Sequence, residues 1–204
     1  MASIRPYRPA DRAAVYAVCV RTAEDGGDAR GLFSSDDLMP DVYAGPYLEL
    51  EPGLAFVVEE DGTGAVVGYV LGTADTARWA VEHRRRWLPQ VAPRYPLPTV
   101  LRTREDRLVD TLHHPERTVH AELGAYPAHL HVDLLPSHQG RGLGRGLVAT
   151  FLGAVREGGA TGFHLGVSPT NTAAQAFYRR LGLRRLEVGD PQALVLGGPT
   201  DLLA

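Results

Sequence analysis

A strand that runs directly into a glycine-rich turn constrains this chain more than any other segment. Residues 129–135 alternate between polar and apolar side chains, as a strand does, and residues 136–146 read PSHQGRGLGRG before an apolar helical stripe. Backbone N–H groups at the start of a helix bind anions, and glycine lets the main chain approach a phosphate closely. Arg141 and Arg145 add positive charge at the same place. The segment therefore predicts a site for a phosphorylated ligand.

The spacing of the glycines distinguishes between the known phosphate-binding loops. The dinucleotide fingerprint G-x-G-x-x-G fails, because its last position falls on Arg145 or Leu147. A Walker A loop needs Gly-Lys, and all 21 basic residues of this chain are arginine. The pattern Q-x-x-G-x-G fits from Gln139 to Gly144. It resembles the pyrophosphate loop of the GNAT superfamily of acyl-CoA-dependent N-acyltransferases, and the alternative is a glycine-rich turn that binds no ligand.

A second motif follows the loop in the order that this superfamily shows. Residues 171–183 read NTAAQAFYRRLGL and resemble the GNAT helix after the fifth strand. Further segments, including IRPYRPADRAAVYAVC, AFVVEEDG and GYVLGTADT, are similar to the acetyltransferase-like C-terminal domain of eukaryotic O-GlcNAc hydrolases. That eukaryotic domain has a degraded pyrophosphate loop, whereas the loop is intact in this chain.

The resemblance implies an α/β GNAT fold, with a mixed and mostly antiparallel sheet and helices on both faces. We expect residues 1–204 to form one domain, with residues 75–127 as a helical insertion between strands 3 and 4. The periodicity of the sequence places the elements. We expect strands at 4–7, 54–59, 65–73, 129–135 and 163–167, a last strand within 183–188 or 193–196, and helices at 11–22, 37–47, 77–88, 103–113, 140–158 and 171–181.

The resemblance also implies acetyl-CoA as the acyl donor. The two parallel strands at 129–135 and 163–167 would splay apart and expose main-chain groups that pair with the amides of pantetheine. The implied contacts are the main chain of the strand end, the loop and the following helix. They comprise Leu134, Leu135, Gln139, Gly140, Arg141, Gly142, Leu143, Gly144, Arg145, Asn171 and Tyr178.

The implied chemistry is direct attack of a primary amine on the thioester. Tyr178 would donate a proton to the departing thiolate, and a main-chain N–H near Leu134 or Leu135 would stabilise the oxyanion. Asp133, on what the alternation predicts to be the non-core face of its strand, is the proton acceptor that we prefer. Glu122 or a water molecule is the alternative acceptor. Structural roles also remain open, as a packed ring for Tyr178 and as an ion-paired carboxylate for Asp133.

The acceptor is less defined by the sequence. Five aromatic residues fall in the two variable segments that would wall the acceptor cleft, where they either stack on a ligand or pack in the core. We expect a small-molecule or peptide amine, and the insertion either narrows the cleft or forms a homodimer surface. These aromatic residues are Tyr43, Tyr47, Trp79, Trp87 and Tyr95.

Composition excludes several other classes. A net charge of −3 argues against a nucleic-acid partner, and no run of 18 apolar residues or signal-peptide pattern is present. His129, His131 and His138 lack a third ligand at fixed spacing, so we expect no metal. The single Cys19, in a helical core stripe, fits a reducing cytoplasm, and the exclusive use of arginine suggests a bacterial source. A non-catalytic acyl-CoA-binding module or a protein-interaction domain is the alternative function.

Overall fold

The structure is a computed structural model that describes residues 2–190 and 193–204. Within these residues one seven-stranded sheet has the order β1-β2-β3-β4-β5-β7-β6. Only β4 and β5 are parallel, and every other neighbouring pair is antiparallel. The expected mixed, mostly antiparallel sheet is confirmed, and both proposed positions for the last strand are strands. The bounds are β1 Ala2–Pro6, β2 Phe56–Glu60, β3 Val66–Thr73, β4 Ala128–Leu134, β5 Gly162–Gly166, β6 Arg184–Leu186 and β7 Val195–Pro199.

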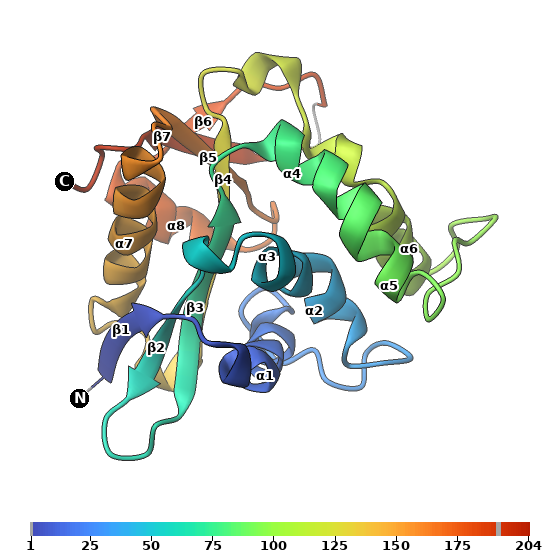
Figure 1. The fold of residues 1–204 in the computed structure, drawn as a ribbon, viewed down its shortest axis with the longest axis horizontal. Coiled ribbons are helices and arrows are strands. Elements are labelled where there is room, and N and C mark those ends of the chain that lie inside the picture. Colours follow the sequence, from blue (N-terminus) through green and yellow to red (C-terminus); the bar gives the residue numbers. More distant parts are fainter. Residues whose placement is uncertain (1, 191–192) are drawn as a thin grey trace.

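Helices cover both faces of the sheet (Figure 1). On one face lies α7 (Leu143–Glu157), whose buried stripe packs across β2, β3 and β4. Its Phe151 ring fits against Gly72 of β3, where an added Cβ would lie 2.5 Å from the ring. On the other face lies α1 (Arg12–Thr22), which packs against β3 and β4. The buried residues of both helices agree with the apolar stripes predicted from the sequence.

The residues between α1 and β2 form two short helices instead of the single one that we expected near 37–47. They are α2 (Leu38–Tyr43) and α3 (Gly45–Leu50), with a non-helical Ala44 between them. Pro46 lies in the first turn of α3 and has no N–H to continue the ladder of α2. Gly45 lets the segment approach Trp87, whose ring would lie 2.6 Å from an added Cβ. The prediction of one continuous helix was therefore wrong.

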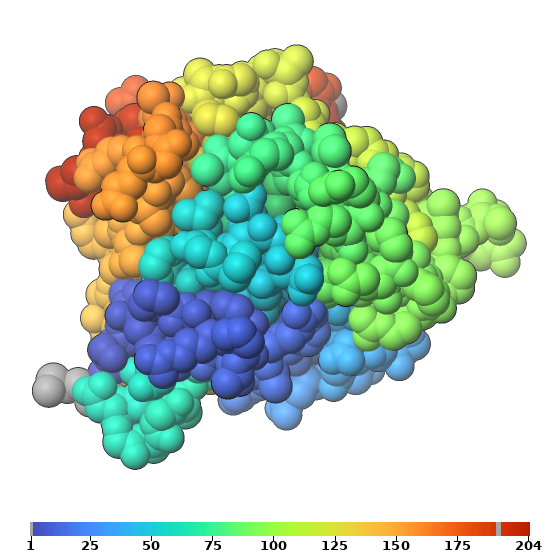
Figure 2. Space-filling view, in the orientation of Figure 1, coloured from blue at the N-terminus to red at the C-terminus, as the bar shows by residue number. Residues whose placement is uncertain are grey.

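The predicted helical insertion between β3 and β4 is confirmed. Asp75 and Thr103 cap its two main helices, each accepting a hydrogen bond at 3.0 Å from the backbone N–H three residues on. A five-residue π-helical turn interrupts the first of them. In order, the insertion contains α4 (Thr76–Glu82), the π-helical turn His83–Trp87, α5 (Leu88–Val91), α6 (Arg104–His113), and 3₁₀ turns at Pro115–Thr118 and Ala121–Leu123. Figure 2 shows the insertion, in green, lying directly against the segment that contains α3, in cyan.

A buried carboxylate on α2 joins α1 to the insertion. Asp41 is 1 % exposed and accepts hydrogen bonds at 2.9 Å from the hydroxyls of Tyr16 and Tyr95. Arg94 contacts the same carboxylate at 2.9 Å, and Trp87 Nε1 donates to the Asp41 carbonyl at 2.9 Å. Every polar atom of this side chain is therefore paired, as burial of a carboxylate requires.

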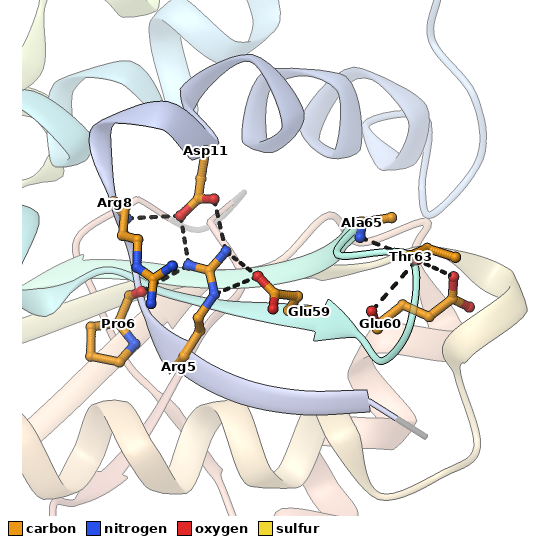
Figure 3. A network of polar contacts seen from close by, with 8 residues as sticks. All are labelled: Arg5, Pro6, Arg8, Asp11, Glu59, Glu60, Thr63 and Ala65. Atoms are coloured by element: carbon orange, nitrogen blue, oxygen red, sulfur yellow. Dashed lines mark hydrogen bonds and ion pairs between the residues drawn. The ribbon is translucent and has the colours of Figure 1, made fainter.

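A second charged group fastens the N-terminal strand to the start of α1 (Figure 3). The Arg5 guanidinium donates to both carboxylate oxygens of Asp11, at 2.7 and 2.9 Å, and to Glu59 of β2 at 2.7 Å. The backbone N–H of Arg8 adds a further bond to Asp11 at 2.8 Å. Arg5 consequently holds the pKa of Asp11 below its usual value.

The parallel pair at the centre of the sheet opens after two register positions. β4 and β5 are paired at Ala128 with Phe163 and at His129 with His164. Beyond them β4 continues to Leu134 beside β3, while β5 continues to Gly166 beside β7. The expected splay of the two strands is confirmed, and their carboxyl ends form a gap in the hydrogen-bonded sheet.

We predict that Asp41→Ala destabilises the protein by about 3 kcal/mol, because two hydroxyls and a guanidinium lose their shared charged partner. Urea unfolding of the variant and the parent measures this difference. Asp37→Ala is the matched control, since Asp37 is 60 % exposed and lies 3.9 Å from Arg94; it should change stability by less than about 0.5 kcal/mol. Equal effects of the two substitutions would contradict the role of Asp41.

Candidate functional site

Because β5 diverges from β4 after His129, main-chain groups along the rest of that edge of β4 have no partner strand. The N–H of Leu135 donates to Val67 O on β3 at 2.9 Å. Main-chain groups alternate in direction along an antiparallel strand, so those of Val132 and Leu134 point away from β3. The carbonyl of Leu134 accepts a hydrogen bond from Gln139 Nε2 at 2.9 Å. Of the two predicted oxyanion donors, the N–H of Leu134 thus lies on the open side, whereas that of Leu135 is engaged with β3.

The glycine-rich loop continues from this strand end into α7. Gly140 and Gly142 have φ of +73° and +80°, and an added Cβ at either would meet nothing within 4 Å. Gly142 is the N-cap of α7, so the N–H groups of Leu143, Gly144 and Arg145 precede the first intrahelical bond, which Gly146 N–H makes to Gly142 O at 3.0 Å. The side chains of Arg141 and Arg145 are exposed beside them. The loop presents backbone donors and positive charge to the solvent.

The helix α8 (Thr172–Leu181) lies next to the first turn of α7. The ring of Phe177 would lie 3.2 Å from a Cβ at Gly144, so the absence of a side chain there sets how closely the two helices approach. Asn171 caps α8, its Oδ1 accepting from Ala174 N–H at 2.9 Å. Tyr178 is 8 % exposed, and its hydroxyl has no hydrogen bond to any of the described residues. Burial, and then the charge of Asp133, raises the pKa of Tyr178.

Helices cover the polar face of β4, which we expected to be the non-core face, and leave His131 and Asp133 half-buried. Asp133 accepts a hydrogen bond from the Tyr69 hydroxyl at 2.5 Å, and burial raises the pKa of its carboxyl. His129, on the same face, is 5 % exposed. The alternation of β4 predicts a strand with one solvent-exposed face, whereas α1, α3 and the insertion cover this face. Glu122, the alternative proton acceptor, lies exposed on a 3₁₀ turn and does not line the cleft described next.

A cleft of about 710 Å³ opens over this face of β4 and β5. Asp133 and Asn171 line it, as do Tyr43, Tyr47 and Trp79 among the predicted acceptor-side aromatics. Trp87 and Tyr95 do not line it, because they pack around Asp41. Besides hydroxyl groups and the side chains of Asp25 and Arg117, six imidazole rings form its polar wall. They belong to His83, His114, His120, His129, His131 and His164.

A chain of hydrogen bonds joins three elements along the wall of the cleft. Thr76 Oγ1 lies 2.8 Å from the carbonyl of Pro127 and 2.7 Å from His129 Nδ1. The Tyr47 hydroxyl lies 2.7 Å from His129 Nε2 and 3.1 Å from His131 Nε2. The sequence offered no sign of this chain, because its members come from α3, α4 and β4.

The geometry of the chain assigns each proton. A carbonyl can only accept, so the Thr76 hydroxyl donates to Pro127 and accepts from His129 Nδ1–H. Burial lowers the pKa of His129 well below its usual value, so the ring is neutral and its Nε2 accepts from the Tyr47 hydroxyl. Tyr47 then accepts from His131 Nε2–H. The lone pair of neutral His131 is consequently on Nδ1.

Among residues 2–190 and 193–204, no group of three or more His, Cys, Asp or Glu side chains is arranged to hold a metal ion. Within the same ranges, no helix combines the length and the apolar character needed to cross a bilayer.

Comparison with known proteins identifies the family. The sequence model of the Acetyltransferase (GNAT) family matches residues 106–183, which include β4, the loop and α8. The crystal structure of SsHAT is 50 % identical to this chain, covers 98 % of both chains, and superposes with a TM-score of 0.92. The chain belongs to the GNAT acetyltransferase family.

Two further similar proteins are more distant from this chain. Rat protein O-GlcNAcase is 29 % identical over an alignment of 203 positions that covers 96 % of this chain and 22 % of the rat protein. The chain thus spans about a fifth of that curated relative. The structure of yncA from Salmonella typhimurium, solved with its cofactor acetyl-CoA, is 17 % identical over 98 % of this chain and 95 % of its own, with a TM-score of 0.56. At that identity the likeness shows the fold, which confirms the GNAT architecture.

The buried imidazoles of this GNAT protein predict acid sensitivity. Burial lowers the pKa of His131 to about 4, from an ordinary value near 6.5. Between these values the unfolded chain binds a proton that the folded chain does not, so stability falls as the pH drops below about 6.5. One such group contributes about 2 kcal/mol between pH 6.5 and 5.

Thermal unfolding at pH 7 and pH 5 measures this effect. The parent should lose stability on acidification, and His131→Gln, which keeps a donor for Tyr47, should lose less. An identical pH dependence in parent and variant would contradict the assignment of a neutral buried ring.

Proposed function

We propose that this protein transfers an acetyl group from acetyl-CoA to a primary amine of a small molecule or peptide. The observation that carries the proposal is the splay of β4 and β5, which leads directly into a loop whose glycines face open space. Strand edges bind extended amide chains, and helix N-termini bind phosphates. We propose that residues 1–204 act as one GNAT domain in the cytoplasm, with residues 75–127 as its insertion and no nucleic-acid partner.

Different segments of the chain are placed to bind different parts of acetyl-CoA. The main-chain groups of Val132 are placed to pair with the pantetheine amides, and Gly140 to Arg145 to hold the pyrophosphate. The carbonyl of Leu134 is engaged with Gln139, so Leu134 contributes its N–H, next to the thioester. Gln139 supports the loop from within, since its side chain is bonded to the carbonyl of Leu134. Asn171, which lines the cleft, is placed near the pantetheine arm.

The catalytic step needs a proton acceptor, an oxyanion donor and a proton donor. Acetyl-CoA supplies the thioester, whose C–S bond breaks as the amine nitrogen forms the new C–N bond. Asp133 accepts the proton that the ammonium must lose, and its raised pKa brings it closer to the pH at which it works. The N–H of Leu134 stabilises the oxyanion, and Tyr178 donates its hydroxyl proton to the thiolate. Tyr178 does not line the cleft itself, but it lies on α8, which is capped by Asn171 of the cleft.

A thiol-release assay with acetyl-CoA and a panel of amines tests the function. The panel should contain alkylamines, amino alcohols, amino acids and short peptides. Amine-dependent release of CoA, with the acetylated amine identified by mass spectrometry, is the expected result. Binding of acetyl-CoA without turnover on any amine would favour a non-catalytic acyl-CoA-binding module, and no binding at all would favour an interaction domain.

We predict that Tyr178→Phe lowers kcat by about 10²-fold, because the leaving thiolate loses its proton donor. The ring and its contact with Phe177 are retained, so the affinity for acetyl-CoA should not change. The thiol-release assay gives kcat, and calorimetry gives the affinity. An unchanged kcat would remove Tyr178 from the proposed chemistry.

We predict that Gly142→Val weakens the binding of CoA by at least about 10-fold, because a side chain enters the space where the phosphates approach the backbone. Gly62→Val is the matched control: Gly62 has a φ of +85°, similar to the +80° of Gly142, and is equally open, but it lies in the β2–β3 turn. Calorimetric titration with CoA should show full affinity for the control. Full affinity for both variants would refute the loop assignment.

A further inference from the structure

Two ring nitrogens in the wall of the cleft are buried without a hydrogen-bond partner. Trp79 is 4 % exposed and His83 is 2 % exposed. Among the described residues, neither Trp79 Nε1 nor His83 Nδ1 has a hydrogen-bond partner. Both side chains line the cleft, and their rings lie 5.0 Å apart. A buried polar atom left unpaired destabilises the folded protein, so such atoms in a cleft indicate a ligand that pairs with them.

Among the described residues, these two are the fully buried side-chain N or O atoms that lack a partner, whereas comparable groups nearby are paired. Tyr47, which stacks on Trp79 at 4.7 Å, bonds to His129 and His131. The other tryptophan of the insertion, Trp87, donates its Nε1–H to Asp41 O at 2.9 Å. The insertion therefore satisfies an indole N–H where it faces the core and leaves one unsatisfied where it faces the cleft.

The charge around the pair defines the group that it would take. Burial, followed by the charge of Arg84, lowers the pKa of His83 to about 4, so the ring is neutral near pH 7. Arg84 is paired with Glu116 and Arg117 with Asp110, each at 2.5 Å. The positive charges of these guanidinium groups are already neutralised. A ligand carboxylate that entered the cleft would therefore lose its hydration without gaining a cationic partner. An uncharged oxygen accepts from Trp79 Nε1–H. A hydroxyl also pairs with His83 Nδ1 in either tautomer, whereas a carbonyl pairs with it when Nδ1 carries the proton.

We propose that Trp79 and His83 form a specificity subsite for an uncharged oxygen, a hydroxyl or a carbonyl, of the amine acceptor. This inference rests on the proposed function, in which the cleft holds that acceptor. Trp79 packs against His129 of β4. His129 lies four residues before Asp133, and four residues of a strand span about 13 Å. The acceptor is then an extended amine with its reactive nitrogen near Asp133 and its neutral oxygen at the insertion. Both subsite residues lie outside the family match at residues 106–183.

Stability of the free protein gives the first test. Trp79→Phe keeps a ring against Tyr47 and removes the unpaired donor, so its melting temperature should equal or exceed that of the parent. Trp87→Phe, the matched control, removes a paired donor and should lower the melting temperature. A decrease in Trp79→Phe as large as that in Trp87→Phe would show that the Trp79 N–H is already satisfied, by a buried water for example, and would overturn the proposal.

Acceptor preference gives the second test. The probes are 8-amino-1-octanol, octylamine and 8-aminooctanoate, which share their chain length. The parent should have a KM for the amino alcohol at least 5-fold below that for octylamine, with the carboxylate no better than octylamine. Trp79→Phe should abolish this preference and Trp87→Phe should retain it. Equal KM values in the parent, or a preference that survives Trp79→Phe, would overturn the subsite.

A binding readout separates failure of the subsite from failure of the proposed function. If no amine is acetylated, the proposed function fails, yet the amino alcohol should still raise the melting temperature of the parent more than octylamine does. That difference should disappear in Trp79→Phe. Equal shifts with the two ligands in the parent would overturn the subsite whatever the catalytic result.

Discussion

The site depends on the early end of the β4–β5 pairing. Two parallel strands normally satisfy each other's main-chain groups along their length, but here the pairing stops at His129 and His164. β3 holds the rest of β4 and β7 holds the rest of β5, so the sheet stays intact on both sides of the gap. The N–H of Leu134 points into this gap, and Gln139 ties the strand end to the glycine-rich loop. One interruption in the sheet thus aligns an open strand edge with a helix N-terminus.

The insertion forms the wall of the cleft that faces the polar side of β4. Asp41 joins α1 and α2 to Tyr95 and Trp87, and this contact holds the insertion over the polar face of β4. Once covered, the imidazoles of that face become neutral and form the hydrogen-bonded chain through Tyr47. The cleft is therefore shaped jointly by the shared GNAT sheet and by residues outside the family match. We propose that the sheet positions the acyl donor and that the insertion selects the acceptor.

The sequence was informative where a local rule decides the structure. The loop at 139–144 and the positions of β2 and β3 follow from backbone freedom and alternation, and all are found. The break at Ala44 was missed although Pro46 signalled it. The burial of Asp133 could not be predicted, because alternation does not reveal what covers a face. The bond between Tyr47 and His129 joins residues 82 positions apart, and only the fold brings them together.

Amide hydrogen exchange with and without acetyl-CoA tests the central claim most directly, because it reads the strand edge and the loop residue by residue. Our account predicts slower exchange at Leu134 and at Leu143, Gly144 and Arg145 when acetyl-CoA is bound. Leu135, whose N–H already donates to Val67, should not change. Unchanged exchange at Leu134 and throughout the loop at saturating acetyl-CoA, or protection confined to another surface, would contradict the claim that the splay of β4 and β5 is the acetyl-CoA site.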